Sequence, residues 1–212
     1  MNLMSLETVV AFIIITIVAT VTPGPTMLYI ASCGLSHGSK GYLPACLGVL
    51  VADFIYFLLT VTGLGIILLA SHELFFLIKW LGVLYLFYLG VKLIFSNYTT
   101  SIDKNEEFSH KIVFHHAFLK GFVVHLANPK TMLFFGALLP QFIDVEKPML
   151  LQVLIIGFIL LFTQAIVSIA YGVMGERIRA KVRSSYIGRR INIISGFLFM
   201  AAGVWLATMR KE

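Results

Sequence analysis

Two short proline-containing strings are the residues of this chain best suited to chemistry. Residues 22–28 read TPGPTML and residues 128–133 read NPKTML, and both strings lie within apolar surroundings. Proline interrupts a helix because it lacks an N–H group and clashes with the preceding turn. In lipid, the carbonyl groups that such a break frees are tolerated only where protein or a water-filled cavity satisfies them. Two breaks at matching places in the two halves of the chain therefore predict a ligand site near the middle of a membrane.

Each string also has the pattern of a helix start. Thr22 and Asn128 are good N-cap residues, and Pro23 and Pro129 suit the first helical position. Exposed N–H groups and the helix dipole give such an end a partial positive charge, and Lys130 adds a full one. We therefore expect two half-helix ends and one ammonium group to form an anion site suited to a carboxylate. A simple kink in each helix is the alternative interpretation.

Asp53 is an acidic residue with apolar residues before and after it. An ionised carboxylate in the middle of a membrane costs roughly 2.5–3.5 kcal/mol, so it needs a partner, a cavity or a proton. Because burial disfavours the ionised form, Asp53 could take up and release a proton, and we predict it to be a coupling residue. An Asp53–Lys130 ion pair that stabilises the fold is the alternative, and substrate binding could open such a pair.

Polar side chains continue along one face of each of two predicted helices. They follow the helical spacings i, i+3, i+7 and i, i+4, i+7, and such faces turn inward in a membrane bundle. For any one of them, a hydrogen bond between helices is as good an explanation as contact with a substrate. The two faces consist of Asp53, Tyr56 and Thr60, and of Gln164, Ser168 and Tyr171.

Other site chemistries find little support in the sequence. Of the histidines, only His125 lies near the second proline string, and no helix carries His, Asp and Cys at metal-ligand spacing. Cys33 and Cys46 form neither a disulfide framework nor a zinc motif. The chain has no phosphate-binding loop, and no base is placed to activate Ser195. We therefore expect neither a cofactor nor an enzyme.

The composition predicts an all-α integral membrane protein. Apolar residues make up 59% and charged residues 12% of the 212 residues, and this charged fraction is about half that of soluble proteins. Six apolar stretches each reach the ~20 residues that a spanning helix needs. We therefore expect a single transmembrane domain over residues 1–212. The predicted spans are 9–33, 41–70, 74–95, 117–139, 149–174 and 191–209.

The charge pattern predicts topology and not nucleic-acid binding. The net charge is +6, and most Lys and Arg residues lie in or beside the first, third and fifth connections, including the run over residues 177–190. By the positive-inside rule these connections lie in the cytoplasm and both termini lie outside. A lipid or regulator site in the run at 177–190 is the less favoured interpretation.

The chain divides into two halves of three predicted helices each. A polar connection at about 96–116 separates a first repeat, about 5–95, from a second, about 117–210. Because three is odd, the second copy enters the membrane from the opposite side, which is the inverted-topology repeat of many transporters. The recurrence of TML at 26–28 and 131–133 supports the repeat. Chance similarity between apolar segments is the alternative.

These motifs together resemble the LysE/RhtB family of amino-acid exporters. The likeness rests on TPGP at 22–25 and NPK at 128–130, and it covers nearly the whole chain in order. The resemblance implies a bacterial inner-membrane exporter of amino acids or close derivatives, coupling to the proton motive force, and a homodimer. It leaves the substrate open. The residues it marks as important are Pro23, Gly24, Pro25, Asp53, Asn128, Pro129 and Lys130.

We therefore predict a secondary transporter that moves a zwitterionic amino acid out of the cytoplasm by alternating access, with lipid and protons as further partners. Asp53 would receive the substrate ammonium or the coupling proton. Export of a divalent metal cation, a passive channel and a non-transporting scaffold are the alternatives. The predicted carboxylate site is Gly24, Pro25, Thr26, Lys130 and Thr131, and the predicted further lining residues are Tyr56, Gln164 and Tyr171.

Overall fold

The computed structural model describes residues 4–63, 106–144 and 148–181 continuously, with isolated helical positions between 80 and 95 and between 193 and 208. All regular secondary structure in these residues is helical. The elements are α1 (Leu6–Val21), α2 (Pro25–His37), α3 (Ser39–Val61), α6 (Glu106–Leu126), α7 (Pro129–Leu133), the π-helix η1 (Phe134–Leu138), the 3₁₀ helix η2 (Leu139–Phe142) and α8 (Met149–Lys181).

Two of the described helices have membrane-spanning length and composition, and two bent helix pairs reach it together. α3 and the segment Met149–Arg179 of α8 each qualify alone. Two further pairs qualify together but are bent at a short break: α1 with α2, by 56°, and Phe114–Leu126 with Lys130–Phe142, by 54°. The predicted spans 74–95 and 191–209 lie largely outside the described residues.

Three helices begin or end at other places than the predicted apolar stretches. α3 ends at Val61 and not near residue 70, and Gly63 follows with φ of 74°, a left-handed conformation that suits glycine. α6 begins at Glu106, so much of the predicted polar connection at 96–116 is helical. α8 continues to Lys181, beyond the predicted end at 174. Apolar composition marks the part of a helix that meets lipid, whereas the helix itself can extend into polar sequence.

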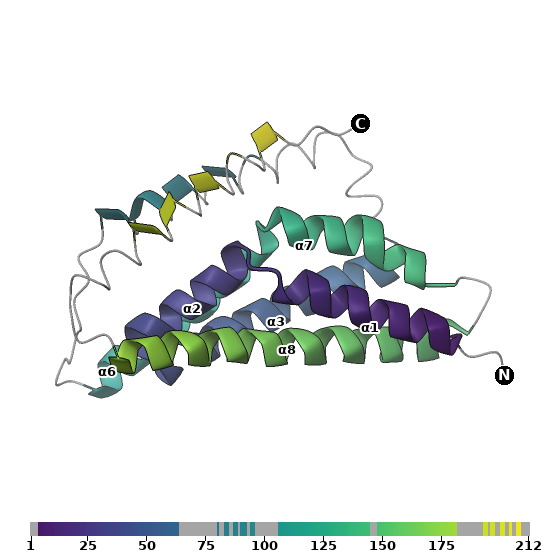
Figure 1. Cartoon of the computed structure of the whole chain (residues 1–212), viewed down its shortest axis with the longest axis horizontal. Helices are drawn as coiled ribbons and strands as arrows, with labels where there is room; N and C mark the ends of the chain where they lie inside the picture. The colour runs from purple at the N-terminus through teal and green to yellow at the C-terminus, as the bar shows by residue number, and fades with distance from the viewer. Residues whose placement is uncertain are drawn as a thin grey trace.

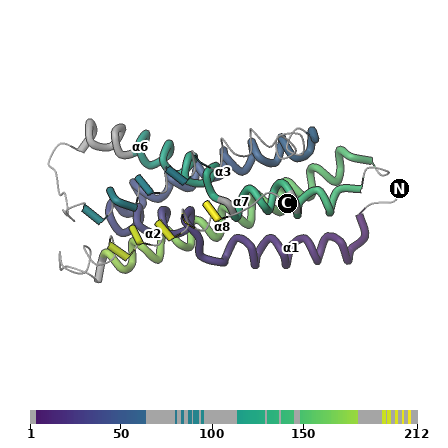
Figure 2. The backbone as a smooth tube through the Cα atoms, turned by 90° about the horizontal axis from the view of Figure 1, so that it is seen from above, coloured from purple at the N-terminus to yellow at the C-terminus, as the bar shows by residue number. Residues whose placement is uncertain are grey.

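The helices pack along one another, and the two broken pairs run in opposite directions through the bundle. α8 runs the length of the described bundle, and α1 and α2 follow each other along it (Figure 1). α1 and the segment that runs from α7 through η1 and η2 lead toward one end, whereas α2 and α6 lie toward the other (Figures 1 and 2). Each broken pair therefore runs from one end of the bundle to the other, and its bend lies in the middle part of the bundle.

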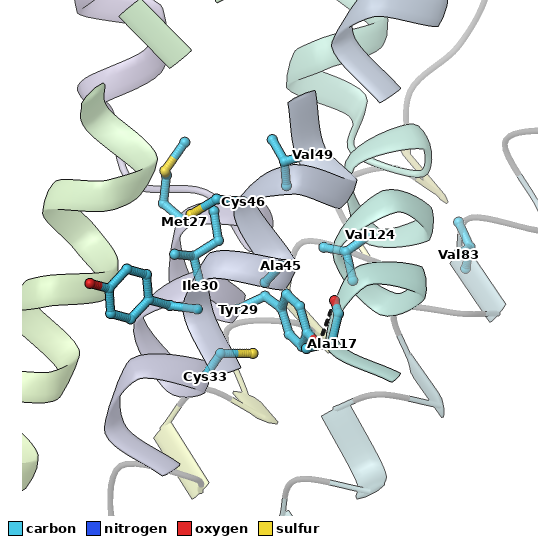
Figure 3. Close-up of a cluster of buried hydrophobic side chains, with 11 residues drawn as sticks. Met27, Tyr29, Ile30, Cys33, Ala45, Cys46, Val49, Val83, Ala117 and Val124 are labelled. Atoms are coloured by element: carbon cyan, nitrogen blue, oxygen red, sulfur yellow. Dashed lines mark hydrogen bonds between the residues drawn. The ribbon is translucent and has the colours of Figure 1, made fainter. Parts of the chain in front are cut away.

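Glycines allow the helices near the α2–α6 end to approach closely. A Cβ atom added to Gly34 of α2 would overlap with the carbonyl oxygen of Gly172 in α8, and one added to Gly48 of α3 would overlap with that of Phe118 in α6. Small residues are the usual means of close helix packing in membranes. A buried apolar cluster around Ile30, Ala45 and Val124 fills the space between α2, α3 and α6 (Figure 3).

Candidate functional site

The first helix break is set by two prolines, and its start differs from the prediction. α1 ends at Val21, and α2 begins at Pro25 with Gly24 as its N-cap. Thr22 and Gly24 have ψ of 120° and −178°, because a residue before proline is pushed out of the helical region. The predicted N-cap Thr22 and first residue Pro23 were therefore wrong. The Thr22 hydroxyl instead donates back to the Val18 carbonyl at 2.6 Å.

The second break follows the prediction. Asn128 is the N-cap of α7, its Oδ1 accepts the Lys130 backbone N–H at 3.1 Å, and Pro129 takes the first helical position. The helix then changes from α to π over Phe134–Leu138 and to 3₁₀ over Leu139–Phe142. Pro140 lies in this last segment and donates no backbone hydrogen bond. Short π segments of this kind are frequent at functional sites.

Side chains from other helices satisfy the carbonyl groups that the breaks free. Lys130 Nζ donates to the carbonyls of Ala19 and Thr22, each at 2.7 Å. The Tyr171 hydroxyl donates to Val21 O at 2.8 Å, and the Tyr56 hydroxyl donates to Leu126 O at 2.6 Å. The Lys130 ammonium thus lies at the C-terminal end of α1, where the helix dipole favours a cation. Two of its three donors are engaged there.

A small cavity of about 40 Å³ lies between the two breaks. It has room for a few water molecules at most. Apolar side chains such as Met27, Phe134 and Leu160 form part of its wall. Among the predicted site residues, those that line it are Gly24, Thr26, Asp53, Asn128, Lys130, Thr131 and Gln164. Those not among the lining residues are Pro23, Pro25, Tyr56, Pro129 and Tyr171.

A chain of hydrogen bonds connects Asp53 with both breaks. Asp53 Oδ1 lies 2.6 Å from His125 Nε2, and His125 Nδ1 lies 3.0 Å from Thr26 Oγ1. Asn128 Nδ2 donates to the same Thr26 oxygen at 2.9 Å. Asp53 therefore pairs with His125, and the alternative of an Asp53–Lys130 ion pair was wrong. All four side chains of the hydrogen-bond chain are buried.

Two buried polar atoms among the cavity-lining residues have no hydrogen-bond partner within the described part of the chain. They are Asp53 Oδ2 and Thr16 Oγ1. The two side chains belong to residues that are only 3% and 2% exposed. A buried acceptor without a donor is unfavourable by about 1–3 kcal/mol, and more when it is charged. These atoms therefore favour a bound group that supplies N–H or O–H donors.

Sequence reasoning missed three polar lining residues: His125, Thr16 and Thr20. His125 was noted only for its place near the second string. Its position in a membrane-spanning helix was a usable signal, because ionisable side chains in such segments are rarely without a role. Thr16 and Thr20 are one turn apart on α1 and face the cavity. Threonine is common enough in membrane helices that this spacing alone would not have selected them.

The residues around Asp53 and His125 supply no third metal ligand. Across the part of the chain that the structure describes, no three His, Cys, Asp or Glu side chains come together as a metal site would require. The donor set of the cavity consists instead of hydroxyl, amide, imidazole, carboxylate and ammonium groups. This set suits a small polar organic molecule that carries both charges.

Comparison with known proteins assigns the chain to a family. Residues 17–210 match the sequence model described as LysE type translocator. The chain belongs to the LysE type translocator family. Membership of a translocator family implies movement of a substrate across a membrane and not catalysis of a reaction. The helices of membrane-spanning length fit this assignment.

Similar proteins match this translocator over nearly their full length. An uncharacterized membrane protein of Vibrio cholerae is 30% identical over 98% of this chain and 100% of its own. Proteins named homoserine/homoserine lactone efflux protein from Salmonella typhimurium and Salmonella typhi are 27% and 28% identical, each over 98% of this chain and 99% of its own. No solved structure matches the chain.

Proposed function

We propose that this translocator exports an amino acid or a close derivative from the cytoplasm by alternating access, driven by the proton motive force. The observation that carries the proposal is the cavity between the helix breaks. It is lined by Asp53, whose Oδ2 is unpaired, and by Gly24 at the N-terminus of α2, beside Lys130. An amino acid carries the complementary ammonium and carboxylate groups. The names of the two Salmonella relatives support the same substrate class.

The carboxylate would bind where α2 begins. No side chain caps the N-terminus of α2, so the first N–H groups of this helix are available to an anion. Lys130 lies alongside, because its Nζ is 3.6 Å from the position that a Cβ atom of Gly24 would occupy. Its third donor is then within reach of a ligand at Gly24. Thr26 and Thr131 line the same region.

The ammonium would bind at Asp53 Oδ2. Since Asp53 Oδ1 is engaged by His125, the second oxygen is the one left for a ligand. The unpaired Thr16 hydroxyl and the Gln164 amide are further polar groups of the cavity wall. They could hydrogen-bond a polar substrate side chain or the ammonium itself.

Transport requires the bundle to open, because a cavity of about 40 Å³ is far below the roughly 300 Å³ of the smallest usual ligand sites. We infer two inverted three-helix repeats that rock about the breaks. One reciprocal contact supports this symmetry. A Cβ atom on Gly90 would lie 2.7 Å from Gly196 O, and one on Gly196 would lie 2.6 Å from Gly90 O. Two corresponding third helices related by a pseudo-two-fold axis would meet in this way.

The proposal includes a setting for the transporter. It places the chain in a bacterial inner membrane as a single lipid-embedded domain of six helices, with both termini outside and with a homodimer as the assembly. Protons are the coupling ion, and neither a cofactor nor a nucleic acid takes part.

Transport by purified protein in proteoliposomes with an imposed pH gradient tests the proposal. Labelled amino acids, homoserine among them, are screened for movement against their gradient. Asp53→Asn is expected to abolish gradient-driven accumulation, because Asp53 supplies the one carboxylate among the lining residues that the structure describes. Glu7→Gln is the matched control, since it removes an exposed carboxylate in the first turn of α1.

Each other outcome assigns a different function. Flux of an amino acid without uphill accumulation would indicate a channel. Movement of divalent metal ions in the absence of amino-acid transport would indicate a metal exporter. Well-inserted protein that moves neither class would support a scaffold.

A further inference from the structure

The hydrogen bonds around Asp53 determine where the hydrogens of the site lie. The backbone N–H of Lys130 can only donate, so the Asn128 atom that it contacts is the oxygen Oδ1. The Asn128 amide nitrogen therefore faces Thr26 and donates to Oγ1. When Asp53 is ionised, its Oδ1 can only accept, so the imidazole hydrogen lies on Nε2 and points to Asp53 Oδ1. A neutral imidazole then accepts the Thr26 hydroxyl hydrogen at Nδ1.

In this arrangement the Asp53–His125 pair carries one negative charge. Uptake of one proton from solvent makes the pair neutral, whether the proton is counted on His125 Nδ1 or on Asp53. When Nδ1 carries a hydrogen it donates to Thr26 Oγ1, which still accepts from Asn128. The network can therefore hold either charge state without leaving His125 unpaired.

The other groups facing the pair are mostly uncharged. α1 contributes Thr16 and Thr20 to the cavity, and α8 contributes Gln164. Lys130 is the one further charged group among the lining residues that the structure describes, and it is held by two carbonyls of the first break. Binding of a proton in the cavity is thus expected to change the charge of the Asp53–His125 pair first.

We propose that Asp53 and His125 bind the coupling proton as one pair, with His125 held by Thr26, and that protonation of the pair displaces the substrate ammonium from Asp53 Oδ2. This inference rests on the proposed export of an amino acid. A substrate ammonium is attracted by the pair when it carries one negative charge and not when the pair is neutral. One bound proton and one bound substrate then exclude each other, and His125 sets the pH at which they exchange.

The pH profile of substrate affinity in proteoliposomes tests the role of His125. In the parent protein, affinity is expected to fall as the pH is lowered and the pair takes up its proton. His125→Gln keeps a neutral N–H donor toward Asp53 but takes up no proton. Its loss of affinity is expected at least one pH unit lower, because imidazoles accept protons about 2 pH units above carboxylates. The control His115→Gln changes an exposed histidine of the same helix and is expected to leave the profile unchanged.

A profile of His125→Gln that coincides with that of the parent protein would overturn the proposal. A second measurement remains informative if this variant fails to fold. In ¹⁵N-histidine-labelled parent protein, the imidazole shifts of His125 report whether the ring carries one hydrogen or two. The ring is expected to change state over the same pH interval as substrate affinity, and a single state across that interval would contradict the proposal.

The two proposals fail in different ways. If the parent protein moves no amino acid, the proposed function is wrong, and the labelled imidazole still tests the pair. Replacement of Asp53 by Asn must then change the pH at which His125 takes up its hydrogen. An unchanged value would show that the two residues do not titrate together.

Discussion

At the scale of single residues, Lys130 shows how a buried charge serves the fold. Its ammonium contacts Ala19 O and Thr22 O, so it joins the second half of one broken span to the first half of the other. The ammonium donates hydrogen bonds to two carbonyls that have no backbone N–H partner because the helix breaks at Pro23. The same group remains a lining residue of the cavity. Structural and ligand-binding roles are therefore combined in one side chain.

Lys130→Met is expected to lower stability by about 2 kcal/mol or more, because it leaves two carbonyl groups of the first break without donors. For a domain of this size that corresponds to a fall of roughly 4–8 °C in the melting temperature, measured in detergent. Lys40→Met, which changes an exposed lysine of α3, is the control. Equal melting temperatures for Lys130→Met and the parent protein would mean that water satisfies these carbonyls.

Tyr56→Phe separates the hydroxyl of this residue from its ring. The ring stacks on Phe135 with centroids 5.3 Å apart, and this contact remains, whereas the hydrogen bond to Leu126 O is lost. The expected loss of stability is about 1 kcal/mol, measured by thermal unfolding in detergent. A Tyr56→Leu variant, which also removes the stacking, should lose more. If the two variants unfold at the same temperature, the stacking contributes nothing.

At the scale of helices, close contacts through glycine hold the α2–α6 end together. Gly48 faces the backbone of Phe118, and a backbone atom cannot move aside without moving its helix. Gly157 is also buried within a helix, but a Cβ atom there would meet the Phe57 ring at 2.9 Å, and a ring can rotate or shift. A larger residue would therefore meet a fixed backbone atom at position 48 and a movable side chain at position 157.

Gly48→Ala is expected to destabilise the protein strongly, since α3 and α6 would have to separate. Gly157→Ala is expected to have a small effect, because the Phe57 ring can give way. The gain in helix propensity, about 1 kcal/mol, is the same for both changes and cancels in the comparison. Melting temperatures in detergent measure the difference. A smaller loss for Gly48→Ala than for Gly157→Ala would contradict the packing argument.

At the scale of the whole molecule, the charge distribution and the course of the helices together predict how the protein is oriented in the membrane. α1 lies toward one end of the bundle, and α2 and α6 lie toward the other (Figure 1). Lys40, at the start of α3, lies beyond α2, whereas Ser5 precedes α1. If basic connections lie in the cytoplasm, Lys40 faces the cytoplasm and Ser5 faces the exterior.

Thiol labelling of intact cells tests this topology. Both native cysteines are buried and free, and they are first replaced by alanine. In that background, Ser5→Cys is expected to react with a membrane-impermeant maleimide from outside. Lys40→Cys is expected to react only after the membrane is permeabilised. The opposite labelling pattern would reverse the orientation and the direction in which the cavity opens.

The sequence alone determined the helical class, the two breaks, the Asn128 cap and the acid and base within apolar stretches. These features are local, because a missing N–H group, an N-cap or a buried charge has its effect wherever the residue lies. The wrong prediction of Thr22 as the N-cap was also local. Either Pro23 or Pro25 could take the first helical position, and α2 begins at Pro25.

Only the tertiary structure decided the partners within the site. Asp53 and His125 are 72 positions apart, and Lys130 reaches back 111 positions to Ala19. The sequence left an Asp53–Lys130 ion pair open as an alternative, whereas the structure gives each of the two residues a different partner. The physical reason is that pairing depends on which helix faces meet and on which carbonyl groups the breaks leave free. Those are properties of packed helices, and no single segment of the chain contains them.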